Sequence, residues 1–310
     1  MKRTFVKSLS MALFCLLLLL PLTAYAVDVD TQRPCSLTLE YSFGEGVFAG
    51  VEVRAYRVAR AESDGSYWLI PPYNGYPVDT YHVTSQAQWQ EITETLEAYI
   101  AADGPEPTQT VTTDENGIAK FTGLETGLYL ISGVVARNEA HIVNFSGFMV
   151  YLPTPVDTEA NYDVIAKPKY SRYAPAPVEY SVVKLWKDNG AATRPASVLV
   201  ELWKDGVLQE TVTLSEENDW HYAWLDPDGT GVWTVVERDV PANYTVTTAC
   251  RDTVFEVINT YDPPTPPDPD LPTTGDTAPV WLYIVAMCVS GTALAFMGAG
   301  GLGGKAREKK

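Results

Sequence analysis

The sequence has few of the residues on which metal and redox sites depend. It contains four cysteines and three histidines in 310 residues. The cysteines show no paired spacing, which excludes a disulfide scaffold and a zinc ribbon. His82, His141 and His221 lie far apart along the chain and offer little material for a metal site. No glycine-rich phosphate loop, nucleophile elbow or zinc signature is present. We therefore predict no cofactor, no metal and no enzyme.

Basic residues are also scarce. Lysine and arginine total 22 against 39 aspartates and glutamates, which gives a net charge of −17. A protein that binds nucleic acid needs a basic surface to neutralise phosphates, so this composition argues against such a partner. A strongly acidic surface favours solubility and mutual repulsion, and it points to no particular ligand.

The N-terminal segment is typical of an export signal. Lys2, Arg3 and Lys7 precede an uncharged apolar run from Met11 to Leu20. Ala24-Tyr25-Ala26 follows and has the small residues of a cleavage site. The apolar run is too short to cross the ~30 Å hydrocarbon core of a bilayer. We predict a signal peptide over residues 1–26, cleaved after Ala26, and secretion by the general pathway.

The C-terminal segment has the length and charge pattern of a membrane span. Residues 280–302 carry no charge and would cross a bilayer as a helix. The tail 303–310 contains four basic residues, which the positive-inside rule places in the cytoplasm. The part of the chain before the span should therefore face outward.

Just before this span lies the pentapeptide Leu271-Pro272-Thr273-Thr274-Gly275. With the span and the basic tail, it resembles the LPxTG wall-sorting signal of Gram-positive surface proteins. The resemblance implies that a sortase cysteine attacks the Thr274 carbonyl and releases Gly275 onward. The acyl group would pass to an amine of peptidoglycan or of another pilin subunit, so the protein would contact the membrane only before sorting. A permanent membrane anchor is the alternative.

Two proline-rich segments divide the exported part of the chain. Residues 173–178 and 262–270 favour extended polyproline geometry, because proline lacks the donor that strands and helices need. We interpret them as a linker and a wall spacer. The modules between them, 27–172 and 179–262, alternate polar and apolar residues with the period of strands. We predict an all-β fold of two Ig-like or prealbumin-like sandwiches in tandem.

One helix interrupts the strands of the first module. Ser85 and Gln88 form a capping box, an apolar stripe follows, and Gly104 ends the pattern, which predicts a helix over about 85–103. The stripe is expected to belong to the core. Its residues are Trp89, Ile92, Leu96, Tyr99 and Ile100.

The first module resembles the helix-containing, SpaA-type pilin domains of Gram-positive bacteria. The matching segments are 50–59, 113–117 leading to Phe121, Leu124 with 127–131, and 162–169. The family implies an internal cross-link between lysine and asparagine or aspartate, with a helper acid. Here Tyr41 or Glu40, Gly133 and Tyr170 stand at those three positions, so we predict no isopeptide bond in this module.

The second module resembles the B-type repeat domain of the collagen adhesin (Cna) family. The resemblance covers nearly the whole module in order. The segments that carry it are 182–186, 194–198, 200–206, 212–214, Asn218, Trp220, Tyr244 and 257–261. Lys204-Asp205-Gly206 is expected to form a hairpin turn.

Three polar residues of this module fall on the apolar faces of their strands. Lys184 shares a face with Val182, Glu237 with Val235, and Asn259 with Val257. Burial would favour the neutral forms of the lysine and the glutamate. The family motif implies that the Lys184 amine attacks the Asn259 side-chain carbonyl while protonated Glu237 assists, releasing ammonia. The alternative is an ordinary half-buried ion pair of Lys184 and Glu237 beside a satisfied Asn259 amide, which the alternation alone would favour.

Lys169 occupies the position at which the pilin motif offers an amine for sortase polymerisation. Lys167 replaces the usual aromatic residue there, so a solvated lysine at a strand end is the alternative. Cys35 and Cys250 fall in different modules, and we expect both to be unpaired.

Taken together, these features predict a sortase-anchored surface protein of the cell wall. It would act as a structural or minor pilus subunit, stiffened by a Lys184–Asn259 bond in the second module. A monomeric adhesin whose first module binds a host or matrix ligand is the alternative. Chemistry on the chain itself would be limited to a single autocatalytic bond formation.

Overall fold

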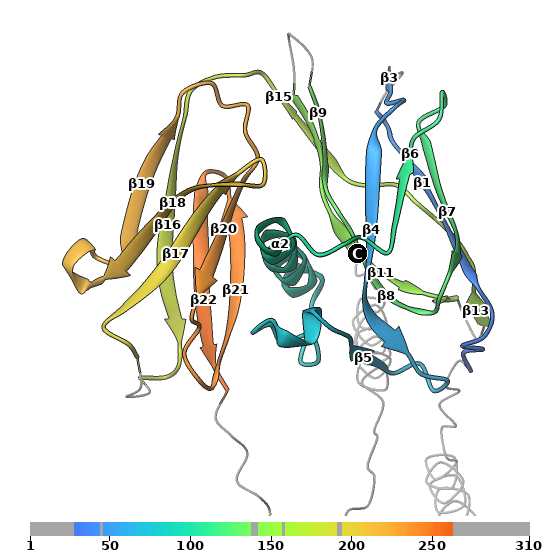
Figure 1. Cartoon of the computed structure of the whole chain (residues 1–310), viewed down its shortest axis with the longest axis horizontal. Helices are drawn as coiled ribbons and strands as arrows, with labels where there is room; N and C mark the ends of the chain where they lie inside the picture. Colours follow the sequence, from blue (N-terminus) through green and yellow to red (C-terminus); the bar gives the residue numbers. More distant parts are fainter. Residues whose placement is uncertain (1–27, 44–45, 138–141, 157–158, 191–193, 263–310) are drawn as a thin grey trace, which may run out of the picture. The chain divides into compact units, whose positions relative to one another are not determined.

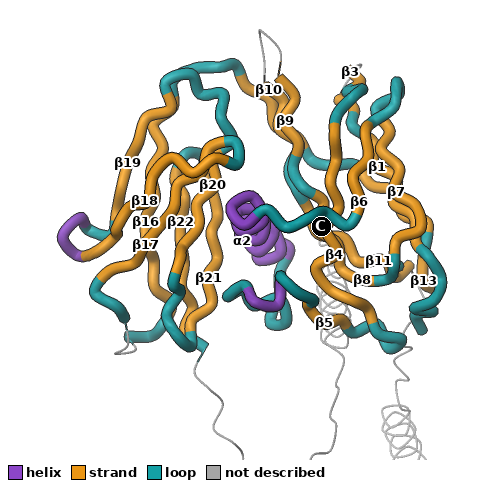
Figure 2. The backbone as a smooth tube through the Cα atoms, viewed as in Figure 1, coloured by secondary structure: helices purple, strands orange, loops and turns teal. Residues whose placement is uncertain are grey.

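The computed structural model describes residues 28–43, 46–137, 142–156, 159–190 and 194–262 (Figure 1). These residues belong to one compact unit, which spans Val27–Asp268. Strands dominate it, which confirms the predicted all-β class (Figure 2). Within the described ranges, no helix is long and apolar enough to cross a membrane. The predicted signal peptide, sorting motif and membrane span lie outside these ranges.

The first module is built from short strands and one long helix. Its strands are β1 (Cys35–Glu40), β2 (Ser42–Phe43), β3 (Gly46–Val47), β4 (Glu52–Ala61), β5 (Tyr67–Leu69), β6 (Gln109–Thr112), β7 (Ile118–Leu124), β8 (Gly127–Ile131), β9 (Val134–Arg137), β10 (Ile142–Phe145), β11 (Phe148–Leu152), β12 (Thr154–Val156), β13 (Glu159–Asn161), β14 (Asp163–Ala166) and β15 (Tyr170–Tyr173). Its helices are the 3-10 turn η1 (Tyr73–Gly75) and the α-helix α2 (Gln86–Asp103).

Three sheets form the framework of this module. They have the strand orders β14-β1-β7, β15-β10-β9 and β11-β8-β4-β5, with β6 paired to β4. On β1, Leu37 and Leu39 are fully buried while their neighbours Ser36, Thr38 and Glu40 are partly exposed, as the alternation predicts. β8 is buried along its whole length and pairs with both β4 and β11. The core of the module therefore lies around β1 and β8.

Helix α2 begins and ends where the sequence predicts. The Ser85 hydroxyl accepts a hydrogen bond from the Gln88 N–H, and the Gln88 side chain bonds the Ser85 backbone in return. Gly104 closes the helix in the left-handed region at φ 62°. The capping box and the glycine thus set both ends of the helix, confirming the predicted span.

The second module is a sandwich of two antiparallel-rich sheets. Its strands are β16 (Val178–Lys187), β17 (Ser197–Lys204), β18 (Val207–Ser215), β19 (His221–Asp226), β20 (Trp233–Arg238), β21 (Tyr244–Arg251) and β22 (Val254–Tyr261), with a 3-10 turn η2 (Glu216–Asn218). One sheet has the order β19-β16-β22-β21 and the other β18-β17-β20. The first and last strands of the module, β16 and β22, pair in parallel at the middle of one sheet.

The predicted turn and the predicted linker can both be located in the structure. Asp205 and Gly206 both have positive φ, 51° and 73°, and they join β17 to β18 as the predicted hairpin turn.

Strands reach Tyr173 on one side of the proline linker and resume at Val178 on the other. The strands therefore include the two end residues of the predicted linker 173–178, because its prolines restrict only the residues between them.

Candidate functional site: a buried lysine, glutamate and asparagine

Lys184 lies on β16 with its side chain fully enclosed. The residue is 3% exposed, although lysine is rarely buried without a partner. Its Nζ donates hydrogen bonds to the backbone oxygens of Leu185 at 3.0 Å and Val257 at 3.2 Å. The same nitrogen lies 4.2 Å from the centre of the Trp186 ring. The amine is thus held in a fixed position in the core.

Asn259 lies on the neighbouring strand β22 and is fully buried. In the parallel register, Lys184 is opposite Val257 and Trp186 is opposite Asn259. Lys184 and Asn259 therefore lie on the same face of adjacent strands, and Asn259 is two residues beyond the residue that pairs with Lys184. The pairing of β16 with β22 is what brings together two residues separated by most of the module.

Glu237 comes from β20 in the opposite sheet and contacts both other residues. It is 1% exposed. Its Oε1 accepts a hydrogen bond from Asn259 Nδ2 at 2.8 Å, and its Oε2 lies 3.5 Å from Lys184 Nζ. The structure therefore brings all three predicted residues together in the interior, with the carboxyl group next to both the amine and the amide.

Burial shifts the pKa values of the two ionisable groups toward their neutral forms. Desolvation lowers the pKa of Lys184 to about 8, against the attraction of Glu237. Desolvation also raises the pKa of Glu237, against the opposing effects of Lys184 and the Asn259 hydrogen bond. Burial therefore favours the neutral form of each group more than exposure to solvent would.

The other buried acids of this module are paired differently. Asp188 accepts two hydrogen bonds from Arg194, at 2.5 and 2.6 Å, and Asp226 accepts one from Lys204 at 2.7 Å. By contrast, Glu237 Oε2 and Asn259 Oδ1 have no hydrogen-bond partner among the described residues. An unsatisfied buried polar atom costs about 1–3 kcal/mol, so these two atoms destabilise the unreacted arrangement.

In the first module, the family resemblance implied a cross-link at the positions of Tyr41 or Glu40, Gly133 and Tyr170. Tyr41 is 1% exposed, whereas Tyr170 is 46% exposed.

Glu97 on α2 carries a carboxyl group that the sequence did not single out. It accepts a hydrogen bond from the Gly133 N–H at 2.6 Å. A Cβ on Gly147 would overlap the Glu97 carboxylate, which would then have to move. Burial raises the pKa of Glu97 to about 7.

The remaining predicted residues lie apart from this site. Lys169 is exposed just before β15, and its backbone oxygen accepts a hydrogen bond from Ser146 N at 2.9 Å. Cys35 and Cys250 are both free thiols. Ala26 and residues 271–275 lie outside the described ranges. Among the residues that the structure describes, no group of three or more histidines, cysteines or acids could hold a metal ion.

Helix α2 also contacts the second module, which the sequence did not indicate. The helix buries Thr93, Thr95 and Ala98 in addition to its apolar stripe. It packs against β20 and β21 as well as β11 (Figure 1). The small and hydroxyl-bearing residues beside the stripe were the available signal, because a helix with one covered face would expose them.

Several solved structures resemble this fold at low sequence identity. A single B repeat unit of the collagen-binding surface protein Cna of Staphylococcus aureus is 17% identical, covers 74% of this chain and 99% of its own, and has a TM-score of 0.27. The full-length major pilin SpaD of Corynebacterium diphtheriae is 14% identical over 76% of this chain and 100% of its own, with a TM-score of 0.31. The shaft pilin SpaA of Lactobacillus rhamnosus GG is 15% identical over 76% and 100%, with a TM-score of 0.27.

Similarity at these levels assigns no function to the chain. No curated protein matches it. The family described as the Cna protein B-type domain matches residues 180–260. This range holds Lys184, Glu237 and Asn259, so the chain contains a Cna B-type domain with the three buried polar residues inside it.

Proposed function

We propose that this chain is a pilin-like surface protein of the cell wall whose second module is stiffened by an amide bond between Lys184 and Asn259. The observation that carries the proposal is the buried contact of Glu237 with both residues, at 2.8 and 3.5 Å. It is supported by the match of residues 180–260 to the Cna B-type domain. The proposed role is mechanical, with no substrate turnover.

The bond forms by one exchange of nitrogen at the Asn259 side chain. The neutral Lys184 amine attacks the Asn259 Cγ and forms the new C–N bond. A half-turn of the Asn259 side-chain amide places its Oδ1, in place of Nδ2, next to Glu237. Protonated Glu237 then donates a hydrogen bond to Oδ1 and stabilises the negative charge that develops there. Glu237 then carries the surplus proton of the amine to the departing nitrogen. The bond from Cγ to Nδ2 breaks, and ammonia leaves.

Proximity takes the place of a separate catalyst. The fold holds the amine, the amide and the acid in the interior, so the reaction needs no encounter of separate molecules. Because β16 and β22 are the first and last strands of the module, the bond would connect its two ends directly. A pulling force applied at both ends would then pass through the covalent link, which limits extension as a disulfide does.

The intact mass of residues 27–268 tests this proposal. We expect the wild-type chain to be lighter than its sequence by one ammonia, and Lys184→Ala and Glu237→Gln to have the unreduced mass. Lys169→Ala is the matched control, because this lysine is exposed on the first module, outside the buried site, and should leave the ammonia loss unchanged. An unreduced mass in folded wild type would refute the bond.

We further propose that sortase attaches the chain to the wall at Thr274. The support is the order of the LPTTG pentapeptide 271–275, the uncharged stretch 280–302 and the basic tail 303–310. Mass spectrometry of wall digests should find fragments that end at Thr274 and are joined to a peptidoglycan amine or to another subunit. A chain that detergent extracts with residues 275–310 still attached would contradict this step.

A monomeric adhesin is the second candidate, and one surface feature favours it. Trp68 and Tyr81 of the first module are 55% and 43% exposed, with ring centres 6.4 Å apart. Exposed aromatic side chains are common in binding surfaces.

A high-mass ladder in wall extracts that Lys169→Ala removes would support a pilus subunit. A single species that binds matrix protein, and loses binding in Trp68→Ala, would support the adhesin.

A further inference from the structure

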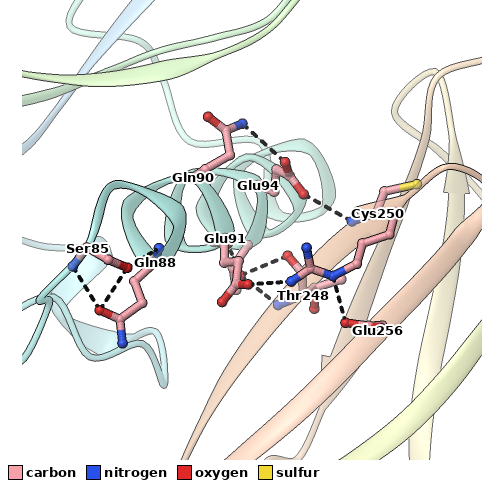
Figure 3. A network of polar contacts seen from close by, with 10 residues as sticks. Ser85, Gln88, Gln90, Glu91, Glu94, Thr248, Cys250 and Glu256 are labelled. Atoms are coloured by element: carbon pink, nitrogen blue, oxygen red, sulfur yellow. Dashed lines mark hydrogen bonds and ion pairs between the residues drawn. The ribbon is translucent and has the colours of Figure 1, made fainter.

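Strands β20 and β21 are edge strands, and α2 supplies the hydrogen-bond partners that their outer edges lack. β20 ends the sheet β18-β17-β20, and β21 ends the sheet β19-β16-β22-β21. The Thr248 N–H donates to the Thr95 hydroxyl at 2.7 Å, and the Cys250 N–H donates to the Glu94 carboxylate at 3.0 Å (Figure 3). A helix of the first module therefore covers an open side of the second.

The contact with β20 falls on the strand residue that carries the helper acid. The Tyr99 hydroxyl donates to the backbone oxygen of Glu237 at 2.9 Å, and both groups are buried. Tyr99 is itself held by stacking on Tyr76, with ring centres 4.8 Å apart. Burial raises the pKa of Tyr99, which keeps its hydroxyl protonated as a donor. The next residue, Arg238, bonds Asp103 at the end of α2 at 3.0 Å.

The contacts of Tyr99 and Asp103 with β20 help to hold Glu237 in place between the two sheets of the second module. On the inner side of the sheet, β20 pairs with β17, and Glu237 is opposite Val200. The Glu237 carboxyl group must reach Asn259 in the opposite sheet and also Lys184, whose nitrogen lies 3.5 Å away. Because that distance is already long for a hydrogen bond, a small outward movement of β20 would separate the acid from the amine.

We propose that α2 of the first module positions Glu237 for amide-bond formation in the second module, with Tyr99 as the positioning residue. This inference rests on the amide bond proposed above. It makes the two modules a single reacting unit: the second supplies the three reacting groups, and the first holds the strand that carries one of them.

The rate of ammonia loss after folding tests the inference. Residues 27–268 are collected unfolded in denaturant after synthesis, diluted to start folding, and followed by intact mass over time. Since a misplacement of about 1 Å can cost about 100-fold in rate, we expect Tyr99→Phe to slow ammonia loss by about tenfold or more. Asp103→Asn, which weakens the adjacent contact to Arg238, should slow it less.

The matched control is Tyr129→Phe. Tyr129 is fully buried in the first module, and its hydroxyl donates to the backbone oxygen of Glu125 at 2.8 Å. Tyr129→Phe deletes the same kind of hydrogen bond without touching β20, so its rate should equal that of wild type. Equal slowing of the two tyrosine variants would show a general loss of stability and overturn the inference.

The pH dependence of the rate distinguishes positioning from a structural effect. The Glu237 charge raises the pKa of Lys184 against desolvation. A more distant Glu237 raises it less. Because the reaction also needs Glu237 protonated, the rate falls at high pH where the pair loses its last proton, and in Tyr99→Phe this fall should occur at lower pH. An unchanged rate and profile in folded Tyr99→Phe would overturn the inference while leaving the bond intact. A wild type that keeps its ammonia would refute both the bond and its positioning.

Discussion

The two modules bury a carboxyl group in different surroundings. Glu237 lies between an amine and an amide, whereas Glu97 lies against the backbone at Gly133 and Gly147. Burial raises the pKa of both acids. Both acids are easily protonated, and Glu237 also has an amine and an amide within its reach, which the proposed bond requires.

The largest expected effect comes from removing the amine at the reactive acid. Lys184→Ala prevents the bond and leaves the Glu237 carboxyl group in the core without the nitrogen beside it. Losing a native disulfide typically costs about 2–5 kcal/mol, and we expect denaturant unfolding to show a loss of this order when the amide link is absent. Lys169→Ala, at an exposed position, should unfold like wild type. If Lys184→Ala is as stable as the control, the two modules do not differ in the way proposed.

The acid of the first module should make stability depend on pH. The pKa of Glu97 is raised from 4.5 to about 7 in the folded chain, so the folded state binds the proton more tightly than the unfolded state. This contribution is complete below pH 4.5 and is lost as the pH rises to 7, by up to about 3 kcal/mol. Denaturant unfolding at several pH values should show this decline in wild type.

Glu97→Gln keeps the shape of the side chain and removes the titration. The difference in unfolding free energy between variant and wild type should therefore change across this pH range. Glu62→Gln, at an acid whose side chain is 42% exposed and pairs with Arg60 at 3.2 Å, serves as the control. Parallel pH curves for wild type and Glu97→Gln would show that the carboxyl group is not buried as described.

A smaller effect is expected at the contact between the modules. Thr95→Val removes the acceptor of the Thr248 N–H and leaves that group buried without a partner, which costs about 1–3 kcal/mol. Hydrogen exchange at Thr248 should increase. Thr93→Val is the matched control, because Thr93 is as buried as Thr95 and its hydroxyl donates to the Trp89 backbone oxygen within the same helix, at 2.8 Å. Equal effects of the two substitutions would argue against a specific contact.

The smallest effect is expected at the exposed margin of the same contact. Arg251 pairs with Glu91 at 2.7 Å and Glu256 at 3.0 Å, but its side chain is 59% exposed. Exposed ion pairs contribute little and are screened by salt. Arg251→Ala should leave the thermal midpoint almost unchanged at moderate salt. A large drop would mean that charges, more than the buried bonds of Thr95 and Tyr99, hold α2 on the second module.

Much of the local structure could be predicted because it depends on neighbours in the chain. The capping box at Ser85, the glycine at position 104 and the turn at Asp205 and Gly206 all have the predicted geometry. The alternation along three strands also placed Lys184, Glu237 and Asn259 on inward faces, and all three are at most 3% exposed. That they would contact one another was carried by the family resemblance, since alternation assigns a face but no partner.

The sequence alone was enough to assign the strand faces and the ends of α2, because each depends on short-range spacing, whereas the export and sorting segments stay predictions. Only the tertiary structure decided which edge strands α2 covers, where Glu97 finds its glycines and that Tyr99 bonds the backbone of Glu237. These contacts join residues far apart in the chain through backbone groups, which are the same at every position and leave no trace in the pattern of side chains.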